Sequence, residues 1–163
     1  YRGFLYAGLM IDENGDPRVV EFNCRFGDPE TQPIMMRMQS DLVELCLKAC
    51  EDNGLKDATI NYDPRPAVGV VIAAHNYPAS PRKGDIIKGL DAASDKDEKI
   101  FEAGTKQVGD DVVTAGGRVL CVTALGDTVA KARDKAYALC EKVHFNGMFY
   151  RKDIAWRAID RNK

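Results

Sequence analysis

Apolar residues near the start of the chain follow the pattern of two β-strands joined by a tight turn. The run GFLYAGLMI, residues 3–11, is almost entirely apolar, and RVVEFNC, residues 18–24, is again strand-like. The polar segment DENGDP between them carries Asn14-Gly15 at its centre, a dipeptide typical of hairpin turns. The pattern predicts a β-hairpin with both of its faces largely covered.

Helical spacing replaces this pattern after residue 30. TQPIMMRMQ, residues 31–39, predicts a short helix, and Ser40 is placed to cap a second one that ends before Gly54. The second helix has an apolar stripe with the spacing of one helix face. Its members are Leu42, Leu45, Cys46, Ala49 and Cys50. We expect this face to pack on a sheet, and residues 56–66, with turn formers near their end, to form a linker.

The second half of the chain mixes strand and helix patterns. AVGVVIAA, residues 67–74, predicts a buried strand, and the Gly116-Gly117 pair between two β-rich runs favours a hairpin. Asp127 or Thr128 is placed to cap a helix whose apolar stripe runs to Val143. The prediction is an α+β protein with an antiparallel hairpin plus helices at residues 1–55, a linker at 56–66 and a small mixed α/β domain at 67–163.

Composition narrows the classes of protein to consider. The chain has 163 residues, 45% hydrophobic and 29% charged, with a net charge of -2. It has no basic block for nucleic acid or anionic membrane, and no apolar run of the roughly 18 to 20 residues that span a bilayer. The five cysteines are scattered and show no C-x-x-C spacing, which favours small buried apolar residues in a reducing compartment. We expect a cytoplasmic protein without nucleic-acid or membrane partners.

Candidate chemistry lies in VVEFNCRFGDPETQ, residues 19–32. Side chains alternate along a strand, so Glu21 and Asn23 share one face. Their oxygen atoms are spaced to contact the same hard cation, and Glu with Asn favours Mg²⁺ or Mn²⁺ over Zn²⁺. Mg²⁺ held by one or two protein oxygens completes its octahedron with water and nucleotide phosphates, so a phosphate-bearing ligand is implied.

A charged turn follows this strand. Arg25 carries a guanidinium suited to a carboxylate or phosphate group, and Gly27 and Pro29 favour a tight bend. Asp28 and Glu30 would extend the polar face into a cleft. A structural alternative explains the same residues: Asp28 caps the next helix, Glu30 lies in its first turn, and Arg25 pairs with either carboxylate.

The same region resembles a known family. GFLYAGLMIDENGDPRVVEFNCRFGDPETQPIMMRMQSDLVEL is similar to the last part of the ATP-grasp region of the phosphoribosylamine-glycine ligases of purine biosynthesis, and RFGDPETQ, residues 25–32, matches that family's signature at each position. FEAGTK, GGRVLCVTALG and RKDIAWRA resemble its carboxy-terminal domain in the same order. The resemblance implies the end of an ATP-grasp lobe followed by a small α/β carboxy-terminal domain.

The resemblance also implies a reaction and roles for the residues above. ATP, as co-substrate, phosphorylates the carboxylate of glycine, and the amine of 5-phosphoribosylamine attacks the acyl phosphate to give glycinamide ribonucleotide, ADP and phosphate. Glu21 and Asn23 match the family's metal positions and would hold Mg²⁺ or Mn²⁺ against the ATP phosphates, while Arg25 would stabilise the charge on the transferred group. The residues expected to line the amino-acid and amine side of the cleft are Gly27, Asp28, Pro29 and Glu30.

The family's other functional parts precede the matched stretch. They are its amino-terminal domains, a Gly-rich phosphate loop, ATP-contacting lysines and a further metal carboxylate. We therefore expect this chain to be the carboxy-terminal portion of a longer enzyme, to need the remainder of that enzyme as its partner, and to be inactive alone. Two alternatives stay open: another purine-pathway ATP-grasp enzyme, and a non-catalytic assembly module.

Two positions depart from the family pattern. His75-Asn76-Tyr77-Pro78 stands where relatives usually have Gly-Gly-Tyr-Pro, and Ala155 stands where they usually have the glycine of DIGWRA. Asparagine tolerates the left-handed backbone conformation and histidine does so less readily, so the first loop is either kept or reshaped.

Overall fold

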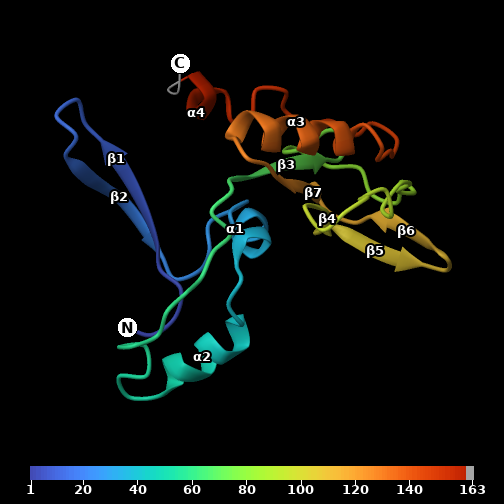
Figure 1. Ribbon diagram of the computed structural model, residues 1–163. Helices are drawn as coiled ribbons and strands as arrows, with labels where there is room; N and C mark the ends of the chain where they lie inside the picture. The colour runs from blue at the N-terminus through green and yellow to red at the C-terminus, as the bar shows by residue number, and fades with distance from the viewer. Residues whose placement is uncertain (161–163) are drawn as a thin grey trace. The chain divides into compact units, whose positions relative to one another are not determined.

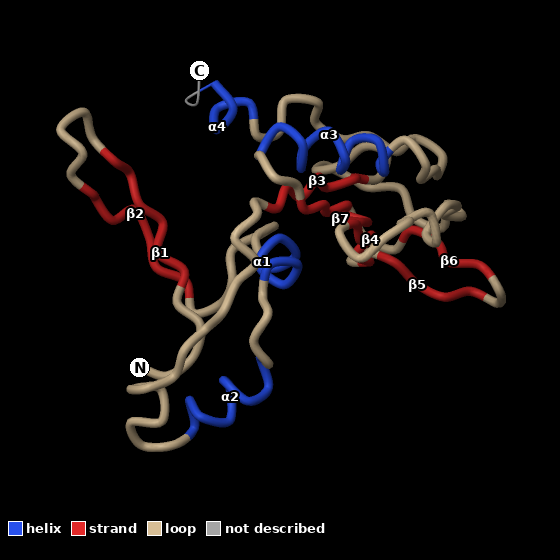
Figure 2. Tube along the Cα trace, in the orientation of Figure 1, coloured by secondary structure: helices blue, strands red, loops and turns tan. Residues whose placement is uncertain are grey.

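The computed structural model describes residues 1–160 and confirms the α+β class. Its helices and strands are drawn in Figure 1 and coloured by type in Figure 2. In chain order they are β1 (Tyr6–Ile11), β2 (Pro17–Asn23), α1 (Thr31–Arg37), α2 (Leu42–Cys50), β3 (Ala67–Ala73), β4 (Glu98–Glu102), β5 (Thr105–Val108), β6 (Asp111–Thr114), β7 (Arg118–Leu125), α3 (Val129–Cys140) and α4 (Trp156–Asp160).

The elements fall into two compact units. The first contains Tyr1–Thr31 and Met38–Tyr62, and the second contains Gln32–Arg37 together with the chain from Asp63 onward. The chain therefore enters the second unit briefly, through most of α1, before it returns to the first. The boundaries expected at residues 55 and 67 describe domains rather than packing units and stay a prediction.

The predicted hairpin is present as β1 paired antiparallel with β2. Its turn is held by the carboxylate of Asp12, which accepts hydrogen bonds of 3.0 Å from the backbone N–H groups of Asn14 and Asp16. Gly15 has a φ of +87°, a conformation that favours glycine.

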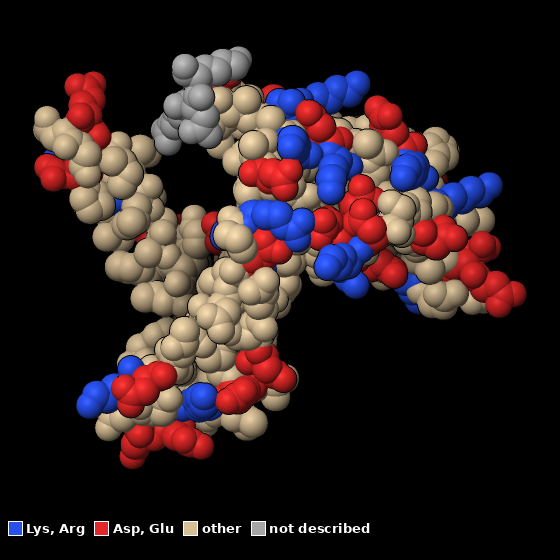
Figure 3. Space-filling view, viewed as in Figure 1, with Lys and Arg blue, Asp and Glu red and all other residues tan. Residues whose placement is uncertain are grey.

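The expectation that both faces of the hairpin are covered is wrong for the described residues. In Figure 3 the hairpin surface is largely tan, with acidic side chains at its tip. Its large apolar residues are exposed: Leu9, Met10, Ile11, Val19, Val20 and Phe22. An apolar run indicates that a strand is buried in the functional protein. It does not show that the residues that bury the strand lie within the same 160 residues.

Helix α2 begins one residue later than predicted. Its cap is Asp41, whose carboxylate accepts hydrogen bonds from the backbone N–H groups of Val43 and Glu44. The hydroxyl of Ser40 instead accepts a 2.8 Å hydrogen bond from the backbone N–H of Asn61. Both residue types are good helix caps, and the longer-range bond of Ser40 could not be read from the local sequence.

The second unit is built around an antiparallel sheet in the order β3-β7-β4. Helix α3 packs on this sheet and is capped by Thr128, one of the two predicted caps. Alternate residues of β3 and β7 meet the buried face of the helix in a single core. The fully buried members of this core include Val70, Ile72, Val122, Ala132, Ala136 and Leu139.

The hairpin predicted at Gly116-Gly117 is wrong. Strand β6 pairs with β5, whereas β7 pairs with β3 and β4, so the two strands beside the glycines belong to different sheets. The backbone N–H groups of Ala115 and Gly116 both donate to the carbonyl of Gly104. A Cβ on Gly104 would lie 2.6 Å from the carbonyl oxygen of Arg118, so the glycines allow two backbone segments to cross closely rather than to form a turn.

Ion pairs stabilise the segment at Asp63, where the chain enters the second unit again. Arg65 forms a bond of 2.7 Å from Nη2 to Oδ2 of Asp63 and another of 2.7 Å from Nη1 to Oδ2 of Asp97. Hydrogen bonds from Arg65 lower the pKa of Asp63 to about 2 and also lower the pKa of Asp97. The guanidinium thus joins the end of the predicted linker to the segment before β4.

The cysteine prediction is correct for two residues and wrong for three. Cys121 and Cys140 are buried, and burial raises the pKa of the Cys140 thiol to about 12. Cys24, Cys46 and Cys50 are exposed, and all five thiols are free. No helix within residues 1–160 has the length and apolar character needed to cross a membrane.

Candidate functional site

The strand β2 places the two predicted metal ligands on one face of the hairpin. Its ladder with β1 is regular at this end, where Gly8 lies opposite Glu21 and Tyr6 lies opposite Asn23. The register shifts between Gly8 and Leu9, which lies outside the interval between the two ligands. Because alternation is intact between them, Glu21 and Asn23 lie on the same side of the sheet.

A small residue opposite Glu21 gives its side chain room. A Cβ on Gly8 would lie 3.1 Å from Cγ of Glu21 and 3.4 Å from Cε1 of Tyr6. The aliphatic part of Glu21 therefore rests over Gly8, beside the ring of Tyr6. Glu21 is exposed and Asn23 is partly exposed, so both polar groups remain accessible to a ligand.

The donor set on this face fits part of a magnesium or manganese site. A carboxylate and an amide oxygen are ligands that these cations prefer. Within residues 1–160, no group of three or more His, Cys, Asp or Glu side chains is placed to hold a metal ion. Glu21 and Asn23 could therefore supply two ligands, and the remaining positions would be filled by water, nucleotide phosphates or other protein groups.

Arg25 follows directly on the strand and is exposed. Its Nη1 donates a 2.8 Å hydrogen bond to the carbonyl oxygen of Phe26. The ring of Phe26 packs on that of Phe4, with centroids 4.2 Å apart. The aromatic pair fixes the backbone that carries Arg25, and its guanidinium remains accessible to an anionic ligand.

The signature turn is closed by its own backbone. The N–H of Glu30 donates a 3.0 Å hydrogen bond to the carbonyl of Gly27, while Asp28 and Pro29 are exposed at the bend. A Cβ on Gly27 would lie 2.2 Å from Oε2 of Glu30, so the carboxylate folds back over the glycine. Helix α1 begins after Glu30 and has no acidic residue in its first turn, which removes that part of the structural alternative.

Sequence reasoning missed one residue of the signature. The side-chain carbonyl oxygen of Gln32 is buried and has no hydrogen-bond partner among the described residues. An unsatisfied buried acceptor costs about 1–3 kcal/mol, so such groups usually find a donor. The available signal was its place as the last residue of RFGDPETQ.

Both departures from the family pattern adopt the left-handed conformation. Asn76 has a φ of +67° and Ala155 a φ of +66°, so both positions have a backbone conformation that favours glycine. Gly117, which precedes β7, lies against Tyr77 of the first loop: a Cβ on Gly117 would lie 2.4 Å from Cδ2 of Tyr77, and the Arg118 guanidinium lies 5.9 Å from the centre of that ring. The second glycine of the predicted hairpin thus makes room for Tyr77.

Comparison with protein families assigns both parts of the chain. Residues 67–157 match the model of the phosphoribosylglycinamide synthetase C domain. Residues 1–31, which include the hairpin and the signature turn, match the ATP-grasp (A) domain of the same synthetase.

Individual relatives agree with this assignment. The chain is 61% identical to a phosphoribosylamine-glycine ligase of Escherichia coli O157:H7 and 57% identical to one of Vibrio vulnificus, in each case over the whole chain and 38% of the relative. The crystal structure of the phosphoribosylamine-glycine ligase of Thermotoga maritima superposes with a TM-score of 0.76 at 41% identity, over 94% of this chain and 37% of that one. The chain thus spans less than half the length of these relatives, and it belongs to the phosphoribosylglycinamide synthetase family.

Proposed function

We propose that this chain is the carboxy-terminal part of an ATP-dependent ligase that joins glycine to 5-phosphoribosylamine. The observation that carries the proposal is the 61% identity to a phosphoribosylamine-glycine ligase across the whole chain. The product would be glycinamide ribonucleotide, formed through glycyl phosphate with release of ADP and phosphate. The five free cysteines fit an enzyme that works in the cytoplasm.

Glu21 and Asn23 are the residues proposed to hold Mg²⁺ or Mn²⁺. Their shared face on β2 and their accessible oxygen atoms support this role. When bound, the cation would neutralise charge on the ATP phosphates, which is the main requirement of phosphoryl transfer.

Arg25 is proposed to stabilise negative charge on the transferred phosphoryl group or the acyl phosphate. An arginine fork can donate two parallel hydrogen bonds to such an oxyanion, and here it projects from a backbone held by an aromatic pair. The Gly27–Glu30 turn is proposed to line the amino-acid and amine side of the cleft. Its exposed Asp28 could attract a protonated amine, and its closed backbone would keep that carboxylate in place.

The proposed site is shared with chain outside these 163 residues. Two protein oxygens on a two-stranded hairpin give a weak cation site, and no third acidic or histidine ligand gathers beside them within residues 1–160. We therefore propose that the remainder of the enzyme supplies the other nucleotide contacts, and that the isolated chain has no ligase activity.

A direct assay of product formation tests this function. Full-length enzyme supplied with ATP, glycine and 5-phosphoribosylamine should form glycinamide ribonucleotide and ADP in equal amounts, and the 163-residue chain should form neither. Arg25→Ala should lower kcat by about 10²–10³-fold, the range found when a charge-stabilising donor is removed. The matched control is Arg18→Ala, which removes an exposed arginine of β2 whose Nη2 lies 3.4 Å from Oδ2 of Asp12.

Two results would contradict the proposal. ADP formation that depends on a carboxylate other than glycine would indicate another ATP-grasp enzyme. Turnover by the isolated chain near that of the full-length enzyme would show that the chain's own residues complete the site.

A further inference from the structure

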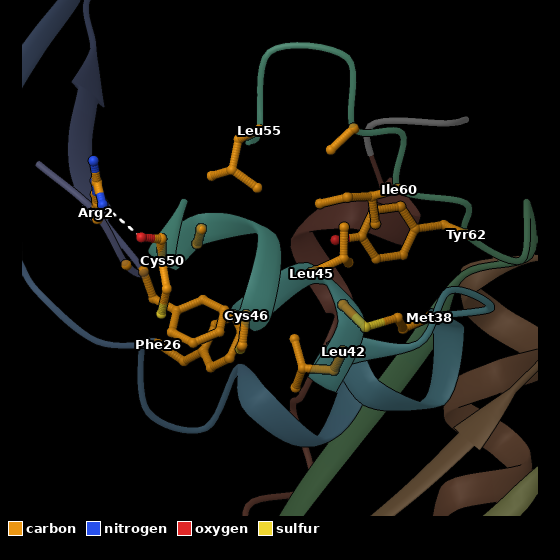
Figure 4. A pocket seen from close by; sticks show the side chains of 14 residues that line it. Arg2, Phe26, Met38, Leu42, Leu45, Cys46, Cys50, Leu55, Ile60 and Tyr62 are labelled. Atoms are coloured by element: carbon orange, nitrogen blue, oxygen red, sulfur yellow. Dashed lines mark hydrogen bonds between the residues drawn. The ribbon is translucent and has the colours of Figure 1, made fainter. Parts of the chain in front are cut away.

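An apolar pocket of about 660 Å³ lies within the first unit (Figure 4). One wall is the face of α2 that carries Leu42, Leu45, Cys46 and Cys50. Leu55, Ile60 and Tyr62 from the segment after the helix also line the pocket, as do Phe4 and Phe26. The pocket is separate from the metal-binding face of β2, since neither Glu21 nor Asn23 lines it.

The apolar face of α2 is not buried, although its sequence pattern is that of a helix that packs on a core. The helix has the stripe of a core-facing helix, yet none of its residues is buried. Around the pocket, Leu55 is 48% exposed, Ile60 47% and Tyr62 42%. Soluble proteins rarely leave a contiguous apolar patch of this kind open to water, so the pocket needs an occupant.

The polar groups at the rim do not favour a small ligand. Ligand pockets usually offer a few converging polar groups that fix the orientation of the bound molecule. The charged group of the lining belongs to Arg2, and it is already engaged: Nη1 donates a 2.8 Å hydrogen bond to the carbonyl of Cys50, and Nη2 bonds the carboxylate of Asp52. The lining therefore fits apolar side chains rather than a polar metabolite.

The start of the chain lies at this rim. The bonds of Arg2 tie the chain start to the end of α2, and Gly3 and Phe4 continue along the pocket wall. Any residues that precede Tyr1 must therefore leave from the edge of the pocket. The relatives share 38% of their length with this chain, so most of a full-length polypeptide would lie outside it.

We infer that the pocket is the docking site of a segment of the same polypeptide that precedes Tyr1 and inserts large apolar side chains against α2. This inference rests on the proposed function, because it requires the chain to be part of a longer ligase. It adds the place where the two parts join. Cys46 and Cys50 would then become buried contacts of that junction, which explains why apolar helix positions carry exposed thiols here.

Thiol accessibility in the full-length enzyme tests the inference. Native enzyme is treated with N-ethylmaleimide, and the labelling rate of each cysteine is measured by peptide mass spectrometry. The thiol introduced by Glu44→Cys is the control, because it lies on α2 but does not line the pocket. Cys46 and Cys50 should react at least about tenfold more slowly than this control, at every protein concentration. Equal rates would overturn the inference.

A photo-crosslink identifies the occupant. Leu55→p-benzoylphenylalanine places a reactive group at the pocket rim of the full-length enzyme, and mass spectrometry locates the linked peptide. We expect the linked peptide to precede Tyr1 in the same chain. Links between copies in a mixture of isotope-labelled and unlabelled enzyme, lost on dilution, would assign the pocket to a second copy and overturn the inference, as would links confined to residues 1–163. Neither measurement depends on catalysis, so a failure here differs from a failure of the ligase assay.

Discussion

Ala155 has a backbone conformation that is costly for alanine, and a single substitution tests that cost. It has a φ of +66°, a conformation that costs an L-residue about 1–2 kcal/mol relative to glycine. Ala155→Gly removes this cost. The substitution also adds freedom to the unfolded chain, worth about 0.5–1 kcal/mol, and removes a partly buried methyl group that packs against the core, worth at most about 0.8 kcal/mol. These terms leave a net change between about 0.8 kcal/mol destabilising and about 1.5 kcal/mol stabilising.

A matched substitution separates the backbone term from the rest. Ala138 is exposed in α3, so Ala138→Gly makes the same chemical change in a helical conformation and should cost about 1 kcal/mol. Urea unfolding of the 163-residue chain measures both, with Trp156, the single tryptophan of the sequence, as the fluorescent reporter beside the mutated site. Ala155→Gly should leave the chain about 1 kcal/mol more stable than Ala138→Gly does. Equal destabilisation by the two variants would refute the strain assigned to Ala155.

Three further outcomes are expected. Leu139→Ala leaves a cavity at a buried position between α3 and the sheet. It should lower the free energy of unfolding by about 2–5 kcal/mol in the same urea assay. A loss under about 1 kcal/mol would show that the side chain of Leu139 is not packed as described. Arg65→Met removes the partner that lowers the pKa of Asp63 from 3.8 to about 2. The difference in free energy of unfolding between wild type and this variant should therefore be largest above pH 4 and shrink as the pH falls towards 2. A difference that stays unchanged across that range would contradict the pairing. Gly27→Ala puts a Cβ where the Glu30 carboxylate lies. In full-length enzyme it should raise the KM for glycine or the amine, while the thermal unfolding temperature stays unchanged. An unchanged KM would show that the turn does not line the substrate site.

Local patterns predicted those elements whose partners are near in sequence. The hairpin follows from two apolar runs around Asn14-Gly15, and α3 follows from its stripe and its Thr128 cap. The pattern failed at Gly116-Gly117 because a glycine pair marks a turn and a close backbone crossing equally well. The crossing partner, Gly104, comes from a different part of the chain, and the local sequence does not identify it.

In the candidate site, too, the sequence predicted the features that depend on the local backbone and not those that depend on distant packing partners. Strand alternation was sufficient to put Glu21 and Asn23 on one face, because a ladder needs only the local backbone. The buried carbonyl of Gln32 and the exposed thiols of Cys46 and Cys50 were not predictable, since each depends on what packs around the residue. Residue types alone left open a structural alternative for Arg25, Asp28 and Glu30. The structure removes only the part that places Glu30 in the first turn of α1.

The shared cation is the central claim, and the affinity of full-length enzyme for Mn²⁺ tests it most directly. Free Mn²⁺ is measured by electron paramagnetic resonance, with and without a non-hydrolysable ATP analogue, in wild type, Glu21→Gln, Asn23→Leu and the control Glu13→Gln, which changes an exposed carboxylate in the hairpin turn. We predict that the analogue tightens Mn²⁺ binding in wild type and the control, and that each ligand variant weakens the ternary complex at least about tenfold. Equal Mn²⁺ affinity in all four proteins would show that Glu21 and Asn23 do not bind the ion.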